Sequence, residues 1–340
     1  MPDGWIILDK PVGLGSTQAV AAVKRNLREA GYGKVKVGHG GTLDPLASGV
    51  LPIALGEATK LAGRMLDSDK TYAFTVRFGS ETDTLDLEGK VVATSDALPS
   101  PAEVEAVLPR FTGPIEQVPP AYSALKVDGK RAYDLARAGE QVELKTRAVT
   151  IHQILPETGR GTMRSMGEGQ VPQSMASRGS PELPVPLHRP ADGPPPRTGE
   201  ELDSLTLVAS VSKGTYIRSL ARDIAHALGT VGHVTWLHRI KAGPFTLERA
   251  ISLDKLNEIG KGAPLEDVIL PLEAGLDDIP ALSLSPEAAG AVRQGRVLSG
   301  LPQGDGLYWA RAGTVPVALM QIEAGTATVV RGFNLPDVAE

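Results

Sequence analysis

Strand-like and helix-like segments share this chain without strict alternation, and this limits the folds that it can adopt. Short apolar runs rich in β-branched residues predict strands, whereas apolar residues spaced three or four apart predict helices. The pattern predicts strands over residues 5–9, 72–78, 90–94, 147–155, 205–211 and 234–241, and helices over residues 16–30, 57–66, 102–108, 131–138 and 216–228. We expect Ser16 to cap the first of these helices. A doubly wound parallel sheet requires regular alternation, so this order favours an α+β fold.

The composition changes abruptly between two of the predicted strands. Residues 158–200 contain seven Gly and eight Pro but no aromatic residue. Such a segment buries too little apolar surface to offset the entropy cost of ordering it. We therefore expect a disordered Gly/Pro-rich insertion that serves as a linker rather than as a partner-binding segment.

A second change of pattern occurs in the last quarter of the chain. Short strand-like runs, Gly-rich turns and one predicted helix near residues 286–294 occupy residues 281–333, which is typical of a small β domain. The expected organisation is therefore a first domain made of residues 1–157 and 201–279, the insertion at residues 158–200, and a C-terminal domain at residues 280–340.

The composition also excludes several kinds of chemistry. The 340 residues include no cysteine, which excludes disulfides, thiolate metal sites and a cysteine nucleophile. The first residues contain neither a basic region nor an apolar signal stretch, and no apolar run approaches the length of a membrane span. We therefore expect a cytoplasmic protein with no membrane partner.

The charges are distributed unevenly along the chain, whose formal net charge is −5. Residues 1–66 carry eight Lys and Arg against five Asp and Glu, and residues 205–250 carry six against two. Residues 252–278 instead carry two Lys against seven acids. A basic face that binds nucleic acid is therefore compatible with an acidic total, although solvated helix faces would give the same counts.

Residues 38–49 form a glycine-rich run around one carboxylate, Asp44. Pro45 disfavours the α conformation for the residue before it, which predicts an extended Asp44 whose side chain caps no helix. The nearby glycines allow another segment of backbone to approach closely. Asp-Pro and Gly-Gly pairs are also ordinary turn signals, so this run alone fits a surface turn as well as an active-site loop.

Ordered sequence blocks around this run resemble the TruB family of tRNA pseudouridine synthases. The resemblance covers roughly residues 5–245 apart from the insertion, and several ordered blocks are more specific than one short motif. The blocks are Gly38-His39, Thr42-Leu43-Asp44-Pro45, Gly49-Val50-Leu51-Pro52, Gly56-Glu57-Ala58-Thr59-Lys60, Lys70-Thr71-Tyr72, Thr82-Asp83-Thr84-Leu85-Asp86, Gln117-Val118-Pro119-Pro120-Ala121-Tyr122-Ser123-Ala124, Ser212-Lys213-Gly214-Thr215-Tyr216-Ile217-Arg218-Ser219 and Leu237-His238-Arg239.

The resemblance implies a pseudouridine synthase fold, a mixed central β-sheet with the active cleft across it, followed by a C-terminal PUA-like RNA-binding domain. It implies an isomerase that converts uridine to pseudouridine at position 55, in the T-loop of tRNA. By the same resemblance we expect the protein to act on the T-arm as a stand-alone monomer, with no guide RNA, no cofactor and no metal.

Three residues match the family's catalytic positions. Asp44 matches the nucleophile, and a carboxylate suits this role because it adds covalently and departs again. Addition at the sugar C1′, addition at the base C6 and a glycal route all remain open. Arg218 is expected to be the counter-charge of Asp44, since a guanidinium stays ionised, whereas an interior Arg bound to another acid is the alternative. Tyr72 is expected to stack on the flipped uracil and to move a proton, although a tyrosine at a strand start is also common in cores.

Five further residues match family positions and are expected to bind substrate. They are His39, Lys60, Asp86, Tyr216 and Leu237. The chain departs from the family pattern at Gly15 and Gly40, where Thr is usual, and we expect looser RNA contacts there. His238 stands where Arg is usual, which is expected to weaken phosphate binding.

Three other functions remain open. Gly13-Leu14-Gly15 follows a predicted strand and opens a predicted helix, as in nucleotide-binding enzymes, but position 18 is Gln rather than the third glycine. A non-catalytic RNA-binding or tRNA-folding protein would use the same basic segments. A guide-dependent, dyskerin-like enzyme shares the Asp motif, although the blocks resemble the stand-alone bacterial form.

Overall fold

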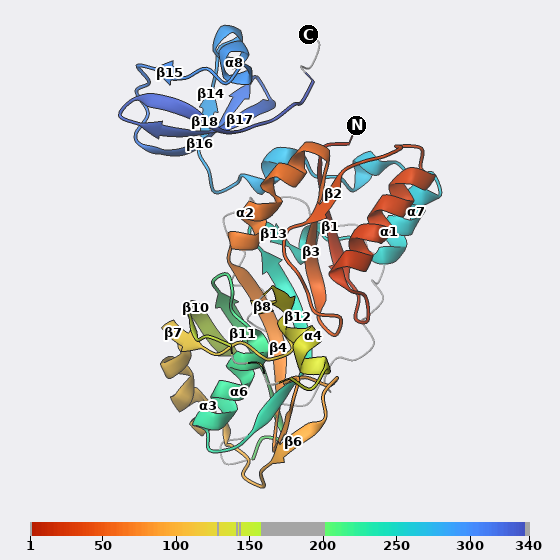
Figure 1. Ribbon diagram of the computed structural model, residues 1–340, viewed down its shortest axis with the longest axis vertical. Helices are drawn as coiled ribbons and strands as arrows, with labels where there is room; N and C mark the ends of the chain where they lie inside the picture. The colour runs from red at the N-terminus through yellow and green to blue at the C-terminus, as the bar shows by residue number, and fades with distance from the viewer. Residues whose placement is uncertain (1, 128, 141, 143, 158–200, 337–340) are drawn as a thin grey trace, which may run out of the picture. The chain divides into compact units, whose positions relative to one another are not determined.

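The computed structural model describes residues 2–127, 129–140, 142, 144–157 and 201–336 (Figure 1). The insertion expected at residues 158–200 lies outside these residues. Within the described ranges, no helix is both long enough and apolar enough to cross a membrane.

A mixed central sheet confirms the α+β prediction. Its strands follow the order β1 (Gly4–Lys10), β3 (Ser48–Leu55), β12 (Gly232–Ala242), β4 (Lys70–Phe78), β11 (Ser204–Val211), β10 (Arg147–Pro156) and β7 (Gly113–Gln117). In addition, β2 (Val37–His39) pairs with β3, and β13 (Phe245–Thr246) pairs with β12. The chain divides into a first unit (Met1–Ala73, Ser210–Thr215, Trp236–Glu340) and a second unit (Phe74–Ala209, Tyr216–Thr235). Three strands have residues in both units: β4 (Lys70–Phe78), β11 (Ser204–Val211) and β12 (Gly232–Ala242).

In the first unit, β3 (Ser48–Leu55) is the strand on which the neighbouring segments assemble. β1 (Gly4–Lys10) and β2 (Val37–His39) pair with it in antiparallel orientation, and Lys10 lies opposite Gly49. β12 pairs with β3 in parallel, and Arg239 also lies opposite Gly49. The start of β3 is therefore the point where Lys10 and Arg239, which are far apart in the sequence, come together.

The two faces of this part of the sheet have separate apolar cores, because successive side chains of a strand point to opposite faces. The face with Ile6 and Leu8 is covered by α1 (Ser16–Glu29) and α7 (Leu253–Gly260), which lie side by side in Figure 1. The core with Trp5 and Ile7 instead includes η5 (Leu272–Gly275) and residues from the C-terminal part of the chain.

In the first unit, one prediction about helices was wrong and another was confirmed only in part. Gly15, not Ser16, is the N-cap of α1, because the Ser16 hydroxyl bonds Leu43 while Gly15 N–H donates to Gln18 Oε1 at 2.8 Å. The helix expected over residues 57–66 is a 3₁₀ segment, η1 (Gly56–Leu61), followed by α2 (Ala62–Asp67). The first turn of η1 is tightened by the Thr59 hydroxyl, which donates to the Gly56 carbonyl at 2.7 Å.

The second unit contains the remaining predicted strands and helices, each within a few residues of its expected bounds. β10 (Arg147–Pro156) pairs with β7 (Gly113–Gln117) in antiparallel orientation. The other elements are β5 (Ser80–Thr82), β6 (Val91–Thr94), α3 (Pro101–Val107), η2 (Leu108–Phe111), β8 (Lys126–Val127), β9 (Lys130–Arg131), α4 (Ala132–Arg137) and α6 (Ile217–Ala227). Helix α6 buries most of its first two turns, which fixes the orientation of the polar side chains beside them.

The C-terminal part of the first unit is the small β structure that the sequence predicts. Its strands follow the order β14-β16-β17-β18-β15, with bounds β14 (Ala281–Ser283), β15 (Leu298–Ser299), β16 (Gly306–Ala312), β17 (Val315–Glu323) and β18 (Thr326–Gly332). α8 (Pro286–Arg293) packs on this sheet through Ala289 and Val292. Short 3₁₀ segments η3 (Leu247–Arg249) and η4 (Leu265–Asp267) belong to the chain that precedes it.

Candidate active site

Asp44 lies in the loop of residues 40–47, which joins β2 to β3, and we call this segment the Asp44 loop. The Asp44 carbonyl accepts the Ala47 N–H at 3.0 Å, which closes a turn with Pro45 at its second position. Asp44 is half-buried, whereas Leu43 and Ala47 on either side are buried in the apolar core under α1. Two buried neighbours thus anchor the loop around an accessible carboxylate.

Ser16 and Lys10 hold the Asp44 loop through its backbone groups. The Leu43 N–H donates to Ser16 Oγ at 2.8 Å, and the Ser16 hydroxyl donates to the Leu43 carbonyl at 3.0 Å. The buried Lys10 ammonium donates to the carbonyls of Leu14 at 2.7 Å and Pro45 at 3.4 Å. Burial lowers the pKa of Lys10 to about 8, and the negative charge of Asp44 partly opposes this change. A buried cation therefore lies within electrostatic reach of the candidate nucleophile.

Tyr72 and Leu237 pack against the same apolar core in the first unit. Each is half-buried, and each packs against the apolar core that contains Leu43 and Ala47. Tyr72 comes from β4 and Leu237 from β12, so two strands present these side chains to the core that anchors the loop. A tyrosine ring held in this way has its packing fixed on one side, as a stacking platform requires.

His39 lies at the end of β2, directly before the Asp44 loop. Its Nδ1 accepts the Gly41 N–H at 3.4 Å. Burial lowers the pKa of His39, and the nearby positive charge of Arg239 lowers it further, so the imidazole is neutral at pH 7. A neutral His39 contributes a ring and a hydrogen-bonding nitrogen to its surroundings rather than a charge.

Lys60 contacts the C-terminal sheet. Its ammonium donates to Glu57 Oε2 at 2.6 Å and to the Gly332 carbonyl at 2.9 Å. The Asn334 N–H donates to the same Glu57 oxygen at 2.7 Å. The expected substrate-binding lysine therefore lies, in this structure, in a polar contact that links η1 to the end of β18.

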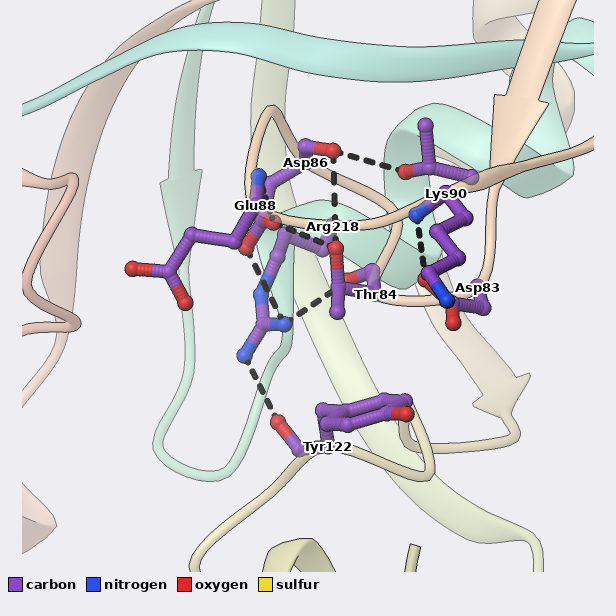
Figure 2. A network of polar contacts seen from close by, with 8 residues as sticks. Asp83, Thr84, Asp86, Glu88, Lys90, Tyr122 and Arg218 are labelled. Atoms are coloured by element: carbon purple, nitrogen blue, oxygen red, sulfur yellow. Dashed lines mark hydrogen bonds and ion pairs between the residues drawn. The ribbon is translucent and has the colours of Figure 1, made fainter. Parts of the chain in front are cut away.

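In the second unit, a tight turn of residues 83–90 contacts the guanidinium of Arg218 on one side (Figure 2). Arg218 Nη1 donates to the Thr84 carbonyl at 2.8 Å and lies 3.3 Å from Asp86 Oδ2, while Nη2 donates to the Tyr122 carbonyl at 3.0 Å. The other Asp86 oxygen accepts the Thr84 hydroxyl and the Glu88 N–H. Arg218 is 6% exposed and Asp86 8%, so this is a buried ion pair in which both groups have several polar partners.

The turn around Arg218 contains strained backbone. Leu85 has a φ of +63°, which is unusual for a residue with a branched side chain. The conformation is held by hydrogen bonds from Leu85 N–H to the Thr82 carbonyl at 3.1 Å and from Val234 N–H to the Leu85 carbonyl at 3.0 Å. Strain of this kind costs roughly 1–3 kcal/mol and tends to occur at functional sites.

Tyr216 is the N-cap of α6, two residues before Arg218. Its N–H donates to Gln117 Oε1 at 2.8 Å, and the Ser219 hydroxyl donates to the Val118 carbonyl at 2.8 Å. The start of α6 is thus tied to the segment that follows β7. Tyr216 is half-buried, so part of its side chain remains accessible.

Comparison with known proteins connects these residues to a family. Residues 27–160 match the TruB family pseudouridylate synthase N-terminal domain, and residues 218–277 match the tRNA pseudouridylate synthase B C-terminal domain. Over the full length of both chains, the protein is 65% identical to tRNA pseudouridine synthase B of Novosphingobium aromaticivorans. The chain belongs to the TruB family of pseudouridylate synthases.

Further relatives and solved structures support this membership. tRNA pseudouridine synthase B of Zymomonas mobilis is 54% identical over 97% of this chain and 96% of its own length. A chain of a solved Cbf5-Nop10-Gar1 complex aligns with a TM-score of 0.64 and 25% identity, over 98% of this TruB-family chain and 84% of that chain. The family resemblance that the sequence blocks indicated is confirmed, and the protein is an isomerase.

The structure also reveals parts of the site that the sequence did not identify. Lys10, Ser16 and Arg239 hold the Asp44 loop. For Lys10 and Arg239, the signal in the sequence was a charged residue inside or at the end of an apolar strand. Such residues are almost never fully buried unless they are partnered. Gly13, part of the glycine pair that resembles a nucleotide-binding motif, donates its N–H to the Pro45 carbonyl at 2.8 Å and so also supports the loop of this TruB-family site.

The polar groups of the site are not arranged as metal ligands. Among the residues that the structure describes, no group of three or more His, Asp or Glu side chains has the arrangement that could hold a metal ion.

Proposed function

We propose that this TruB-family enzyme isomerises uridine to pseudouridine at position 55, in the T-loop of tRNA, and that Asp44 is its nucleophile. The observation that carries the proposal is the construction of the Asp44 loop. Asp44 is the only carboxylate in the loop, and buried groups fix the backbone around it, namely Ser16 at Leu43 and Lys10 at Pro45. A nucleophile requires such positioning, since a small displacement costs much of the rate.

The reaction breaks the N-glycosidic bond, rotates the uracil and joins it to the sugar again through C5. A carboxylate that adds to the substrate and later departs divides this reaction into easier steps. Addition at C1′, addition at C6 and expulsion of uracil to give a glycal each start from an ionised Asp44.

Tyr72 and Arg218 have the other catalytic roles in this proposal. A target uridine leaves its base stack before it reaches an active site, and an aromatic ring then replaces the lost stacking. The packing of Tyr72 against the core beneath the Asp44 loop supports that role. The role of Arg218 as the counter-charge of Asp44 rests on the family motif, and the fixed guanidinium next to Asp86 suits a charge that must not move.

The remaining expected residues bind the RNA in this proposal. His39, Leu237 and Tyr216 each lie on an element that carries a proposed catalytic residue or directly beside one. For Asp86, which is buried beside Arg218, only the family motif supports contact with RNA. For Lys60, only the family motif supports contact with RNA, since its described contacts lead to the C-terminal sheet.

We further propose a catalytic domain made of residues 1–157 and 201–279 and an RNA-binding domain at residues 280–340. The protein acts as a cytoplasmic monomer on the T-arm, without a guide RNA. The solved complex that aligns with it contains further protein chains, but the relatives from Novosphingobium aromaticivorans and Zymomonas mobilis are named tRNA pseudouridine synthase B.

The test uses the purified chain and an unmodified tRNA transcript, with no other RNA or protein added. Pseudouridine is mapped by carbodiimide labelling, and a transcript with cytidine at position 55 is the control. Labelling at position 55 of the first transcript alone is the expected result. Modification at another uridine would contradict the proposed target, and tRNA binding without any product would favour the non-catalytic RNA-binding alternative.

A further inference from the structure

Arg239 connects the two ends of the Asp44 loop. Its Nη2 and Nη1 donate to the carbonyls of Gly41 and Thr42, each at 3.3 Å, where the loop begins. Its Nε donates to the Val50 carbonyl at 2.7 Å, just after the loop ends. The residue is 1% exposed. One buried guanidinium therefore binds backbone on both sides of Asp44.

The backbone around Arg239 is closely fitted. Gly49 has a φ of +103°, and a Cβ placed on it would lie 2.3 Å from the Arg239 carbonyl oxygen. Gly41 has a φ of +140°, and a Cβ there would lie 3.5 Å from Arg239 Nη1. Gly49 therefore allows β12 to approach this backbone closely, whereas at Gly41 the constraint is a backbone conformation that residues with a side chain rarely adopt.

The chemistry of these contacts requires a planar, multidentate donor. The three carbonyls belong to different parts of the backbone, and a guanidinium presents its N–H groups in a fixed fork that can reach them together. A lysine ammonium carries all of its donors on one nitrogen, whereas Arg239 uses three separate nitrogens for these carbonyls. The positive charge of Arg239 also acts on its surroundings: burial is the main cause of the lowered pKa values of His39, Lys10 and Lys70, and the charge of Arg239 lowers each pKa further.

We propose that Arg239 is a positioning residue that holds the Asp44 loop in its reactive geometry. The inference rests on the proposed role of Asp44 as nucleophile. Arg239 acts through the backbone of residues 41, 42 and 50 rather than through contact with the substrate. Its loss therefore affects the chemical step more than the binding of RNA, because the guanidinium is buried and holds backbone rather than RNA.

The test compares Arg239→Met and Arg239→Lys with the wild type on the same unmodified tRNA transcript. Methionine keeps the length of the side chain without donors, and lysine keeps the charge without the fork. We expect a loss of about a hundredfold in the single-turnover rate for Arg239→Met, as for a misplaced reacting group, with the Kd for tRNA changed only a few fold. Arg239→Lys should lie between Arg239→Met and the wild type.

A second readout follows the loop directly. Hydrogen exchange of the Leu43 and Ala47 amides, which are bonded to Ser16 and to Asp44, should become faster in both variants. Amides in β16 and β17 should not change relative to the wild type. If Arg239→Met does not fold, Arg239→Lys carries the test by rate and exchange together.

Leu256→Ala is the matched control for general destabilisation. Leu256 is fully buried in α7 and packs in the apolar core that contains Leu43 and Ala47. Its apolar side chain makes no hydrogen bond to the loop. The control should lose stability and keep its single-turnover rate below its melting temperature. Wild-type rates in both Arg239 variants, or rate losses no larger than that of Leu256→Ala at equal stability, would overturn the inference. An inactive wild type, or an active Asp44→Asn variant, would instead overturn the proposed function.

Discussion

The Asp44 loop and the turn around Arg218 position their charged groups in opposite ways. In the first unit the proposed nucleophile is a carboxylate on a loop, and the buried cations Lys10 and Arg239 hold the loop through its carbonyl oxygens. In the second unit the proposed counter-charge is the cation Arg218, which lies beside Asp86 and donates to the carbonyls of Thr84 and Tyr122. Both arrangements compensate a buried charge with fixed dipoles or an opposite charge, because an uncompensated one would be too costly.

The contrast predicts how the loop and the turn would each respond to the substitution of a charged residue. A loop held through backbone carbonyls should lose its geometry when a cation is removed. A buried cation held by a carboxylate should instead lose its charge compensation when that acid is neutralised.

The largest expected effect comes from Asp44→Asn, which removes the charge of the loop and leaves its shape. Turnover should fall below detection, because an amide cannot act as the nucleophile, while the Kd for tRNA should stay within a few fold of the wild type. Carbodiimide mapping and filter binding on one transcript measure the two quantities. Substantial pseudouridine from this variant would show that Asp44 is not the nucleophile.

Asp86→Asn tests the second arrangement. The amide keeps a similar shape but removes the negative charge that faces the buried Arg218, so we expect a loss of about 4 kcal/mol in the free energy of unfolding together with a large loss of activity. Urea unfolding at pH 7 gives the first quantity. Glu88→Gln is the matched control, since this neighbour in the same turn is exposed and contributes its N–H rather than its side chain. Equal stability of the two variants would mean that Asp86 does not compensate Arg218.

The cations that hold backbone also predict a pH dependence. Lys70 is buried and donates to the carbonyls of Met65 and Leu66, each at 2.8 Å, and burial lowers its pKa from 10.5 to about 8. Between these values the unfolded chain binds the proton and the folded chain does not, so the Lys70 contribution to stability rises with pH. The advantage of the wild type over Lys70→Met should therefore grow by about 3 kcal/mol across this window.

Urea unfolding at several pH values from 7 to above 10 provides the measurement for Lys70. The difference between wild type and variant should be constant below pH 8, because both states are then protonated. Lys213→Met serves as a control, since that lysine side chain is 63% exposed and should show no comparable change. A difference independent of pH would mean that Lys70 keeps its proton in the folded state.

The smallest expected effects concern the polar contact at Lys60. Lys60→Met and Glu57→Gln should each raise the apparent KM for tRNA a few fold, because partly exposed ion pairs contribute about 1 kcal/mol or less. Both changes weaken the contact with Gly332 and Asn334, but only the first removes a positive charge. A higher KM in Lys60→Met alone would show that the ammonium binds RNA phosphate instead of holding the C-terminal sheet.

Much of the local structure follows from the sequence alone. The strands and most helices begin and end within a few residues of the predicted bounds, because apolar periodicity depends on neighbours along the chain. The turn at Asp44 and Pro45 is likewise local, since proline restricts the residue before it. The sequence blocks also sufficed to identify the family, as the comparisons confirmed.

Only the tertiary structure decided which polar groups meet. Ser16 has the character of a helix cap, yet its hydroxyl bonds Leu43, because the Asp44 loop supplies a closer partner. Arg239 reaches the loop because β12 pairs in parallel with β3, at a separation of 190 residues between Arg239 and Gly49. A local pattern records that a residue is polar, but the partner of a buried polar group depends on which distant carbonyl or carboxylate the fold brings within hydrogen-bonding distance.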